Sequence, residues 1–210
     1  MNKLRLNRFL YFTFTFFFLI YFSTLNLRPY PFSYIAKIIP IIAILGLAYN
    51  NLIGKKKSLI ITALIFSAIG DIILDLNGKG FFIFGLISFA IAHCFYILAF
   101  FAKQQLHKIQ LIFALLFILY GITAAIILIP YLGKMLIPVI IYLIIITSMA
   151  VSVALGKNNY LAILGAFLFV LSDSLIAFNM FYIKIPHSSF WILGTYFPAQ
   201  FLLTYGSYKK

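Results

Sequence analysis

Apolar residues occur along the chain in eight long runs, and short breaks that carry turn residues or charges separate them. Residues 54–57 (GKKK) and 156–159 (GKNN) are two such breaks. Each run approaches the roughly twenty residues that a helix needs to cross a bilayer, and none alternates as a barrel strand would. The sequence therefore predicts eight membrane-spanning helices. The predicted spans are Phe9–Leu25, Phe32–Leu52, Leu59–Leu76, Phe81–Phe101, Ile109–Ile129, Met135–Leu155, Tyr160–Phe181 and Ser188–Tyr208.

No break is long enough to separate two domains, so residues 1–210 are expected to form a single all-α, polytopic membrane bundle. The third and seventh spans resemble each other, because residues 64–74 around Asp71 can be aligned with residues 166–176 around Asp173. Downstream, residues 89–93 resemble residues 196–200. This pattern favours two parallel four-helix repeats about an axis along the membrane normal, with the two aspartates as counterparts.

The composition excludes a soluble domain. Hydrophobic residues make up 65% of the chain and charged residues only 9%, whereas a soluble protein is about one quarter charged. The net charge of +13 would suggest nucleic acid in a soluble protein. Here the basic residues lie mostly between apolar runs, where they contact anionic headgroups. We therefore expect contact with membrane lipid and no nucleic-acid binding. The single cysteine, Cys94, forms no intrachain disulfide and no thiol–metal motif.

The basic residues are distributed unequally between the two sides of the predicted bundle. Eleven lie on the side of the chain termini and four, Arg28, Lys79, Lys134 and Lys184, lie on the opposite side. Lys and Arg accumulate on the cytoplasmic side of membrane proteins. We therefore predict a multi-pass protein of the cell (inner) membrane with both termini in the cytoplasm.

Polar side chains inside the spans are the candidate functional residues, because an ionisable group at mid-span costs about 2.5–3.5 kcal/mol or more. They are Asp71 and Asp75 in the third span, Asp173 in the seventh, Lys37 in the second, His93 in the fourth and Gln200 in the eighth. A rise of about 1.5 Å per residue places Asp71, Asp173 and Lys37 in the outer half of the membrane. His93 and Gln200 fall near mid-depth. We expect these groups to converge on one buried pocket.

Several of these residues also have a purely structural interpretation. Asp75 could cap the turn that follows its helix, and Lys37 could extend to the headgroups. Gln200 could join two helices by a hydrogen bond, and His93 could pair with Tyr96 in the core. A structural salt bridge is the weaker alternative for Asp71 and Asp173, because Lys37 can serve only one of them.

Four motifs surround these residues. They are Ser67-x-x-Gly70-Asp71, Gly85-x-x-x-Phe89-x-x-Ala92-His93-x-x-Tyr96, Gly165-Ala166-x-x-Phe169-x-x-Ser172-Asp173-Ser174 and Tyr196-x-x-x-Gln200. Together they resemble the YhhN family of lysoplasmalogenases, from about the second span to the eighth. One departure is that Pro40 follows Lys37 by three residues, where the family tends to have Pro directly after Lys. Asp75 is not part of the family pattern.

The resemblance implies hydrolysis of the vinyl ether bond of lysoplasmalogens, giving a fatty aldehyde and a glycerophospho-ethanolamine or -choline. Protonation of the β-carbon of a vinyl ether produces an oxocarbenium ion, which water captures. A neutral carboxylic acid can supply the proton while a second carboxylate stabilises the cation, as the paired carboxylates of glycosidases do. An apolar environment can keep one carboxyl group protonated near neutral pH.

We therefore predict that Asp71 and Asp173 are the catalytic acid and the stabilising carboxylate, in either order, close enough to share a water molecule. The residues expected to orient water or substrate are Lys37 (toward the phosphate), Ser67, His93, Tyr96, Ser172, Ser174, Tyr196 and Gln200. The expected partner is a lysophospholipid that enters from the lipid, and we expect no metal or cofactor. The same cluster would also suit a proton-coupled carrier or a lipid-binding membrane protein.

Overall fold

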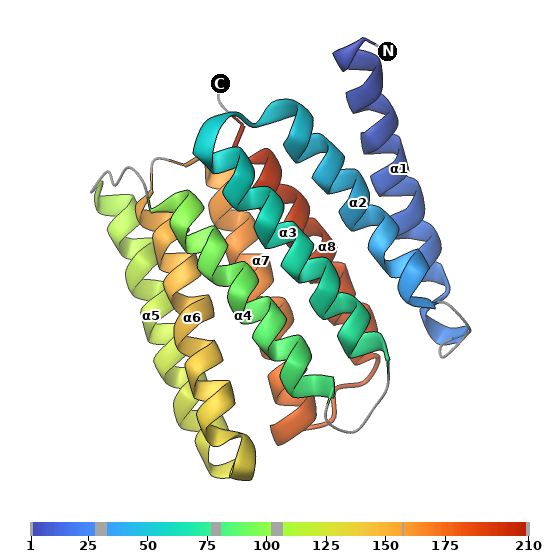
Figure 1. Cartoon of the computed structure of the whole chain (residues 1–210). Coiled ribbons are helices and arrows are strands. Elements are labelled where there is room, and N and C mark those ends of the chain that lie inside the picture. Colours follow the sequence, from blue (N-terminus) through green and yellow to red (C-terminus); the bar gives the residue numbers. More distant parts are fainter. Residues whose placement is uncertain (1, 28–32, 77–80, 102–106, 157, 209–210) are drawn as a thin grey trace.

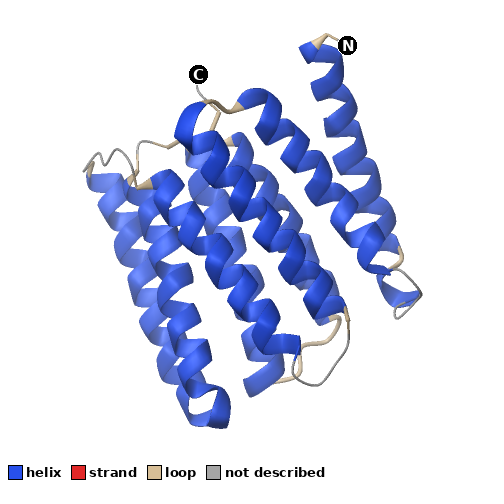
Figure 2. Ribbon diagram, in the orientation of Figure 1, coloured by secondary structure: helices blue, strands red, loops and turns tan. Residues whose placement is uncertain are grey.

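The computed structural model describes residues 2–27, 33–76, 81–101, 107–156 and 158–208. These residues form eight α-helices and no strand (Figures 1 and 2). The helices are α1 (Lys3–Ser23), α2 (Ser33–Asn51), α3 (Gly54–Asp75), α4 (Phe81–Phe100), α5 (Lys108–Leu128), α6 (Leu136–Leu155), α7 (Tyr160–Ala177) and α8 (Ser188–Tyr205). The short helical turns are η1 (Leu25–Leu27), η2 (Ile129–Tyr131) and η3 (Gly133–Met135), which are 3₁₀, and η4 (Phe178–Tyr182), which is π-helical and extends α7.

Each predicted span corresponds to one of these helices, and local capping determines where several of them begin. The Asn2 side chain accepts a hydrogen bond from the backbone N–H of Leu4 at 3.3 Å, so α1 begins before the apolar run. Asn159 caps α7 in the same way through the N–H of Leu161 at 3.2 Å. Gly54 begins α3 with a φ of 62°, a conformation that glycine adopts without steric penalty. That conformation allows a connection of two residues after α2.

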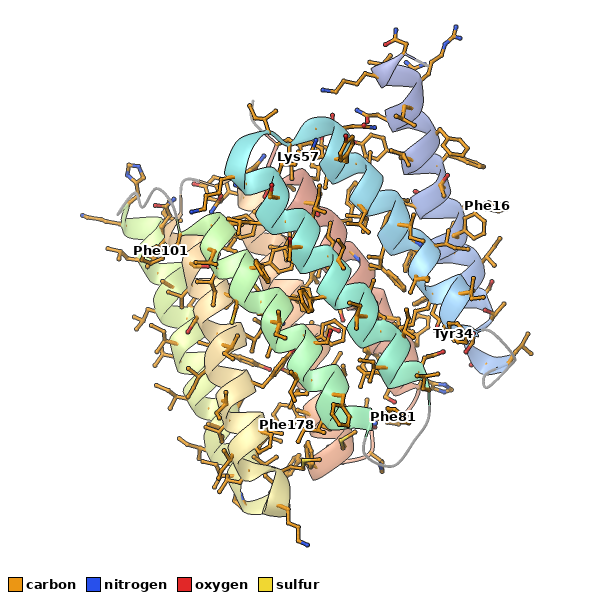
Figure 3. All side chains as sticks on the ribbon, in the orientation of Figure 1. Phe16, Tyr34, Lys57, Phe81, Phe101 and Phe178 are labelled. Carbon is orange, nitrogen blue, oxygen red and sulfur yellow. The ribbon has the colours of Figure 1, made fainter. Side chains whose placement is uncertain are left out.

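Seven helices in the described part of the chain are long and apolar enough to cross a membrane. The remaining helix, α8, is less apolar because it carries Thr195, Gln200 and other polar residues. It packs closely along α7, and seven of its residues are buried, including Gln200. Large apolar side chains project from the outer surfaces of the helices (Figure 3). The chain is therefore a multi-pass membrane protein, as predicted.

Six helices form a closed ring in the order α2, α3, α4, α6, α7 and α8. Outside the ring, α1 packs against α2 and α5 packs against α6, at the two outer edges of the bundle (Figure 1). The packing order of the first half, with one outer helix and three ring helices, thus recurs in the second half. Lys56 near the start of α3 donates to Asn158, just before α7, at 3.2 Å, so α3 and α7 run in the same direction across the ring.

The start of α1 and the end of α8 lie at the same end of the bundle (Figure 1). Most of the described basic residues lie there too, so we call it the basic end. The basic residues at this end are Lys3, Arg5, Arg8, Lys55, Lys56, Lys57 and Lys108, and those at the opposite end are Lys134 and Lys184. Outside the described residues lie Arg28, Lys79, Lys103, Lys157, Lys209 and Lys210.

The closest approach of α7 and α8 depends on Gly165. A Cβ atom there would lie 2.7 Å from the backbone nitrogen of Leu203, and a backbone atom cannot move aside as a flexible side chain does. We expect Gly165→Ala to lower the stability by about 1–3 kcal/mol, as overpacking does. Gly194→Ala is the control, because its Cβ would lie 3.4 Å from the Phe22 ring. Thermal unfolding in detergent measures both variants, and equal melting temperatures would contradict the expected tight contact.

Candidate active site

The polar side chains inside the ring form two hydrogen-bonded groups. The first is centred on Asp71 of α3, which is 2% exposed. The Nζ of Lys37, on α2, lies 3.0 Å from Asp71 Oδ1 and donates to the backbone oxygen of Asp71 at 3.3 Å. The Tyr196 hydroxyl, on α8, donates to Asp71 Oδ2 at 2.6 Å. Asp71 is thus held in a buried ion pair, and a hydroxyl occupies its second oxygen.

The Asp71 group continues through Gln200 to α4. The Gln200 Nε2 donates to the Tyr196 hydroxyl oxygen at 3.2 Å, and the Gln200 Oε1 accepts a hydrogen bond from Tyr96 at 2.5 Å. The network therefore connects α2, α3, α8 and α4. Hydrogen bonds of this kind contribute to helix association where lipid supplies no competing partner.

The second group is centred on Asp173 of α7. The Tyr142 hydroxyl, on α6, donates to Asp173 Oδ2. The Nε2 of His93, on α4, lies 3.0 Å from the Tyr142 hydroxyl oxygen and 3.5 Å from Asp173 Oδ2. The other ring nitrogen of His93 is buried and has no hydrogen-bond partner within the described part of the chain. The Asp173 side chain is 12% exposed, compared with 3% for that of Asp71.

Two small cavities border Asp173. One, of about 40 Å³, lies among α3, α4, α6 and α7, and the other, of about 30 Å³, lies among α5, α6 and α7. Apart from Asp173, Tyr142 and Ser174, the side chains that line them are apolar. A water molecule needs about 10–15 Å³ measured in this way. Asp173 therefore borders spaces large enough for a water molecule or a small part of a substrate.

A central aromatic cluster is formed by Phe89, Phe169 and Tyr196, of which Tyr196 also belongs to the Asp71 group. Its ring centroids are 5.5 to 6.5 Å apart, and Phe169 also contacts the His93 ring at 4.6 Å. Among the described residues, no hydrogen bond joins the Asp71 group to the Asp173 group. The polar residues thus do not form the single pocket that the sequence predicts, because bulky aromatic side chains fill the centre of the ring.

The structural interpretations of Lys37 and Asp75 also change. Lys37 does not extend to the headgroups, since its side chain is 8% exposed and paired with Asp71. Asp75 is buried and accepts a hydrogen bond from Ser33 at 2.6 Å. The turn at residues 77–80, which Asp75 is expected to cap, lies outside the described residues.

The three serines of the predicted site do not contact either aspartate through a hydrogen bond. Ser172 donates to the backbone oxygen of Ile192 at 3.1 Å, and Ser174 donates to that of Val170, one turn earlier in its own helix, at 2.6 Å. The Ser67 hydroxyl is buried without a hydrogen-bond partner among the described residues. Ser172 thus ties α7 to α8, while Ser174 bonds only within α7.

Tyr142 is the residue of this site that the sequence analysis missed. It lies within the apolar run Met135–Leu155, and the chain contains 14 tyrosines, most of which have no special role that a pattern reveals. The available signal was a hydroxyl group within a span that also carries Thr147, Ser148 and Ser152. Ser33, the partner of Asp75, was also missed, because it lies at the end of a span rather than inside it.

The two groups are built alike. Asp71 contacts Lys37 from α2 and Tyr196 from α8, whereas Asp173 contacts Tyr142 from α6 and His93 from α4. Each aspartate is therefore held by the second helix of its own half and the fourth helix of the other half. A pseudo-two-fold axis through the centre of the ring would produce the same choice of partner helices for both aspartates.

Comparison with known proteins agrees with this arrangement. The sequence profile of the YhhN family matches residues 32–207, which include every residue of both groups. The chain belongs to the YhhN family. Within it, the chain is 33% identical over 153 residues to lysoplasmalogenase TMEM86A of Bos taurus, covering 69% of this chain and 62% of that protein. It is 31% identical over 182 residues to lysoplasmalogenase TMEM86B of Homo sapiens, covering 85% and 76%.

The match spans less than two thirds of the length of the TMEM86A relatives from Bos taurus and Homo sapiens, at 62% in each. No solved structure gives a significant match to this YhhN chain.

The buried ion pair of this YhhN protein gives a prediction about stability. Removing one partner of a buried pair leaves an uncompensated charge, which costs about 3–5 kcal/mol. We expect Lys37→Met and Asp71→Asn each to lower the melting temperature in detergent strongly, and the double variant to lose much less than the sum. Lys134→Met, which removes an exposed cation, is the control and should change stability by about 0.5 kcal/mol or less. Additive losses would show that the pair is not coupled.

Proposed function

We propose that this protein hydrolyses the vinyl ether bond of lysoplasmalogens, giving a fatty aldehyde and a glycerophospho-ethanolamine or -choline. Membership of the YhhN family and the names of its curated relatives support this activity. The observation that carries the proposal is the Asp173 carboxyl group, which lies inside the membrane bundle beside two apolar cavities. An acid in such surroundings can protonate an apolar, electron-rich double bond.

The proposed reaction begins with transfer of a proton from the Asp173 carboxyl group to the β-carbon of the vinyl ether. The resulting oxocarbenium ion is then captured at its α-carbon by water, which loses a proton to the Asp173 carboxylate. The hemiacetal collapses as its ether oxygen receives a proton from the Asp173 carboxyl group, its carbon–oxygen bond breaks, and its hydroxyl group returns a proton to the Asp173 carboxylate. The products are a fatty aldehyde and the free glycerol hydroxyl, so one water molecule is consumed.

Tyr142 and His93 have supporting roles in this proposal. The Tyr142 hydroxyl donates to one carboxyl oxygen of Asp173, which stabilises the carboxylate after it has given up its proton. The other oxygen remains to carry the acidic proton. His93 Nε2 lies within 3.5 Å of both Tyr142 and Asp173, so a neutral imidazole there can orient the attacking water.

Asp71 has a different role in this proposal. Its charge is compensated by Lys37, and its second oxygen holds the Tyr196 hydroxyl. A carboxylate paired in this way is a poor proton donor. We therefore assign the acid role to Asp173, and Asp71 positions Tyr196 within the central aromatic cluster. Lys37 acts as the counter-ion of Asp71 rather than as the ligand of the substrate phosphate.

The proposed topology places the protein in the cell (inner) membrane with its basic end in the cytoplasm. Seven of the nine described basic residues outside the ring interior lie at that end. We expect a reporter fused after Lys210 to be active when it requires the cytoplasm, and a reporter that requires export to be silent there. The reverse pattern would overturn the orientation.

The activity is tested by incubating purified protein with lysoplasmalogen and measuring the released aldehyde. We expect Asp173→Asn to reduce turnover by about 10²–10³-fold or more, because asparagine preserves the shape but cannot donate the acidic proton. Its melting temperature should be nearly unchanged, since asparagine is neutral and has the same shape as the protonated carboxyl group.

Asp75→Asn is the matched control, because it makes the same change at another buried aspartate, which borders neither cavity at Asp173. It should retain most of the turnover. Wild-type turnover in Asp173→Asn would show that Asp173 is structural. Absence of aldehyde from the folded wild-type protein would refute the proposed activity itself.

A further inference from the structure

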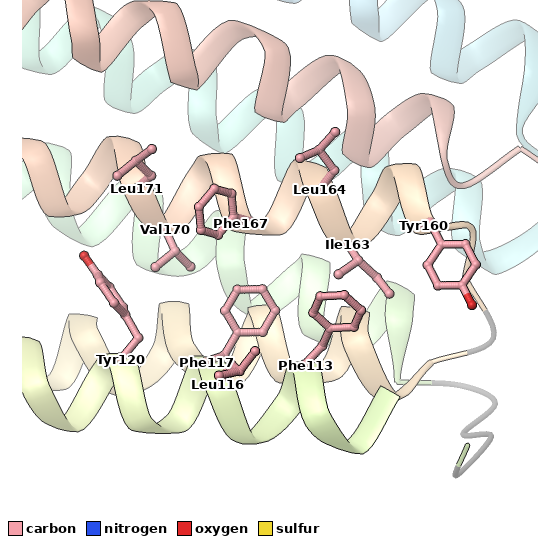
Figure 4. Close-up of a pocket in the computed structure, with 10 residues that line it drawn as sticks. All are labelled: Phe113, Leu116, Phe117, Tyr120, Tyr160, Ile163, Leu164, Phe167, Val170 and Leu171. Atoms are coloured by element: carbon pink, nitrogen blue, oxygen red, sulfur yellow. The ribbon is translucent and has the colours of Figure 1, made fainter. Parts of the chain in front are cut away.

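A long apolar groove lies between α5 and α7, on the outside of the ring (Figure 4). Its volume is about 520 Å³, within the roughly 300–1,000 Å³ typical of small-molecule sites. The groove exists because α5 packs against α6 and η4 but has little contact with α7. The residues that line it are Phe113, Leu116, Phe117 and Tyr120 of α5, and Tyr160, Ile163, Leu164, Phe167, Val170 and Leu171 of α7.

The groove has a buried floor and an exposed rim. Phe117, Ile163 and Val170 are at most 7% exposed and form the floor. Leu116 and Phe167, by contrast, are at least half exposed. In a membrane this rim faces the hydrocarbon, so a lipid chain can enter from the side without crossing water.

The groove lies next to the surroundings of Asp173. Val170 lines both the groove and the 30 Å³ cavity beside Asp173, and Asp173 lies less than one helical turn further along α7. The wide groove and the narrow space at the carboxyl group thus have one wall residue in common. The narrow space is too small for two chains, which favours a single-chain lipid over a phospholipid with two chains.

The length of the groove fits one hydrocarbon chain. From Tyr160 to Leu171 it extends along α7 for about 16 Å at 1.5 Å per residue. One leaflet of the hydrocarbon core is about 15 Å deep, half of the roughly 30 Å core. A chain that begins at Asp173 and follows the groove toward Tyr160 would therefore be about as long as an ordinary lipid tail.

We propose that this groove binds the hydrocarbon chain of the lysolipid, with the vinyl ether at Asp173 and the chain end near Tyr160. The polar headgroup then points away from the basic end, toward the end that carries Lys134 and Lys184. The groove sets which chain lengths are accepted. The position of the vinyl ether rests on the proposed function, whereas occupancy of the groove can be measured without turnover.

Occupancy is measured with a 1-O-alkyl lysophosphatidylethanolamine that carries a diazirine at its chain end. This ether has no double bond and cannot be hydrolysed by the proposed reaction. After irradiation of the full-length protein in lipid nanodiscs, we expect labelled peptides from residues 113–120 and 160–171. Excess unlabelled lysolipid should displace the probe, and diacyl phospholipid should not. Labelling elsewhere, or equal displacement by diacyl phospholipid, overturns the proposal.

A pair of matched variants makes the test specific to the groove. Leu164→Trp places a bulky side chain on the groove wall, whereas Leu119→Trp makes the same change at a lipid-facing position of α5 outside it. We expect labelling to fall about tenfold in Leu164→Trp and to be unchanged in Leu119→Trp. Equal labelling in the two variants overturns the proposal.

Chain-length preference supplies a second readout. In the aldehyde assay, Leu164→Trp should lower turnover of long-chain substrate about tenfold while short-chain substrate is turned over as in wild type. Equal losses for both lengths overturn the role of the groove in chain selection. If the wild-type protein releases no aldehyde but the groove is labelled as expected, the proposed function fails and the lipid site stands.

Discussion

The hydrocarbon of a bilayer offers no hydrogen-bond partner, so polar side chains within this bundle are stabilised mainly by partners inside the protein. The Lys37–Asp71 ion pair is the strictest case, because either charge alone in that position would be very unfavourable. Its contacts, together with those of Tyr196, Gln200 and Tyr96, involve four of the six ring helices. Tyr196 and Gln200 of α8 are buried and take part in these hydrogen bonds, as the same need requires.

Asp71 and Asp173 look alike in the sequence and lie in two halves that are approximately symmetric. The side chains that contact them are nevertheless different. At corresponding positions, the second helix of one half supplies a cation and that of the other half supplies a phenol. Lysine forms a buried ion pair with Asp71. Tyrosine leaves Asp173 with a hydrogen bond but no counter-ion, beside space for a ligand. The same arrangement of helices can thus stabilise the bundle in one half and, under the proposed function, position the catalytic acid in the other.

The sequence predicted the helices well because a bilayer imposes long apolar runs, and Asp71, Asp173 and His93 stood out as polar residues within them. The sequence could not predict which of the polar side chains would form ion pairs and hydrogen bonds with one another. Lys37 was known to serve only one aspartate, but the choice depends on which helices are neighbours in the ring. Tyr142 was hidden among many tyrosines. Phe89 and Phe169 divide the predicted single pocket, and aromatic residues in an apolar span give no sign of pointing inward.

The central aromatic cluster bears on whether protons could pass through the bundle along its polar side chains. Protons cross membranes along connected chains of polar groups, and acidic residues buried at different depths could provide such a chain. Here the rings of Phe89 and Phe169 interrupt the hydrogen bonds between the Asp71 group and the Asp173 group. Within the described residues, the two groups of acidic side chains can thus lie in one membrane bundle without a continuous hydrogen-bonded chain between them.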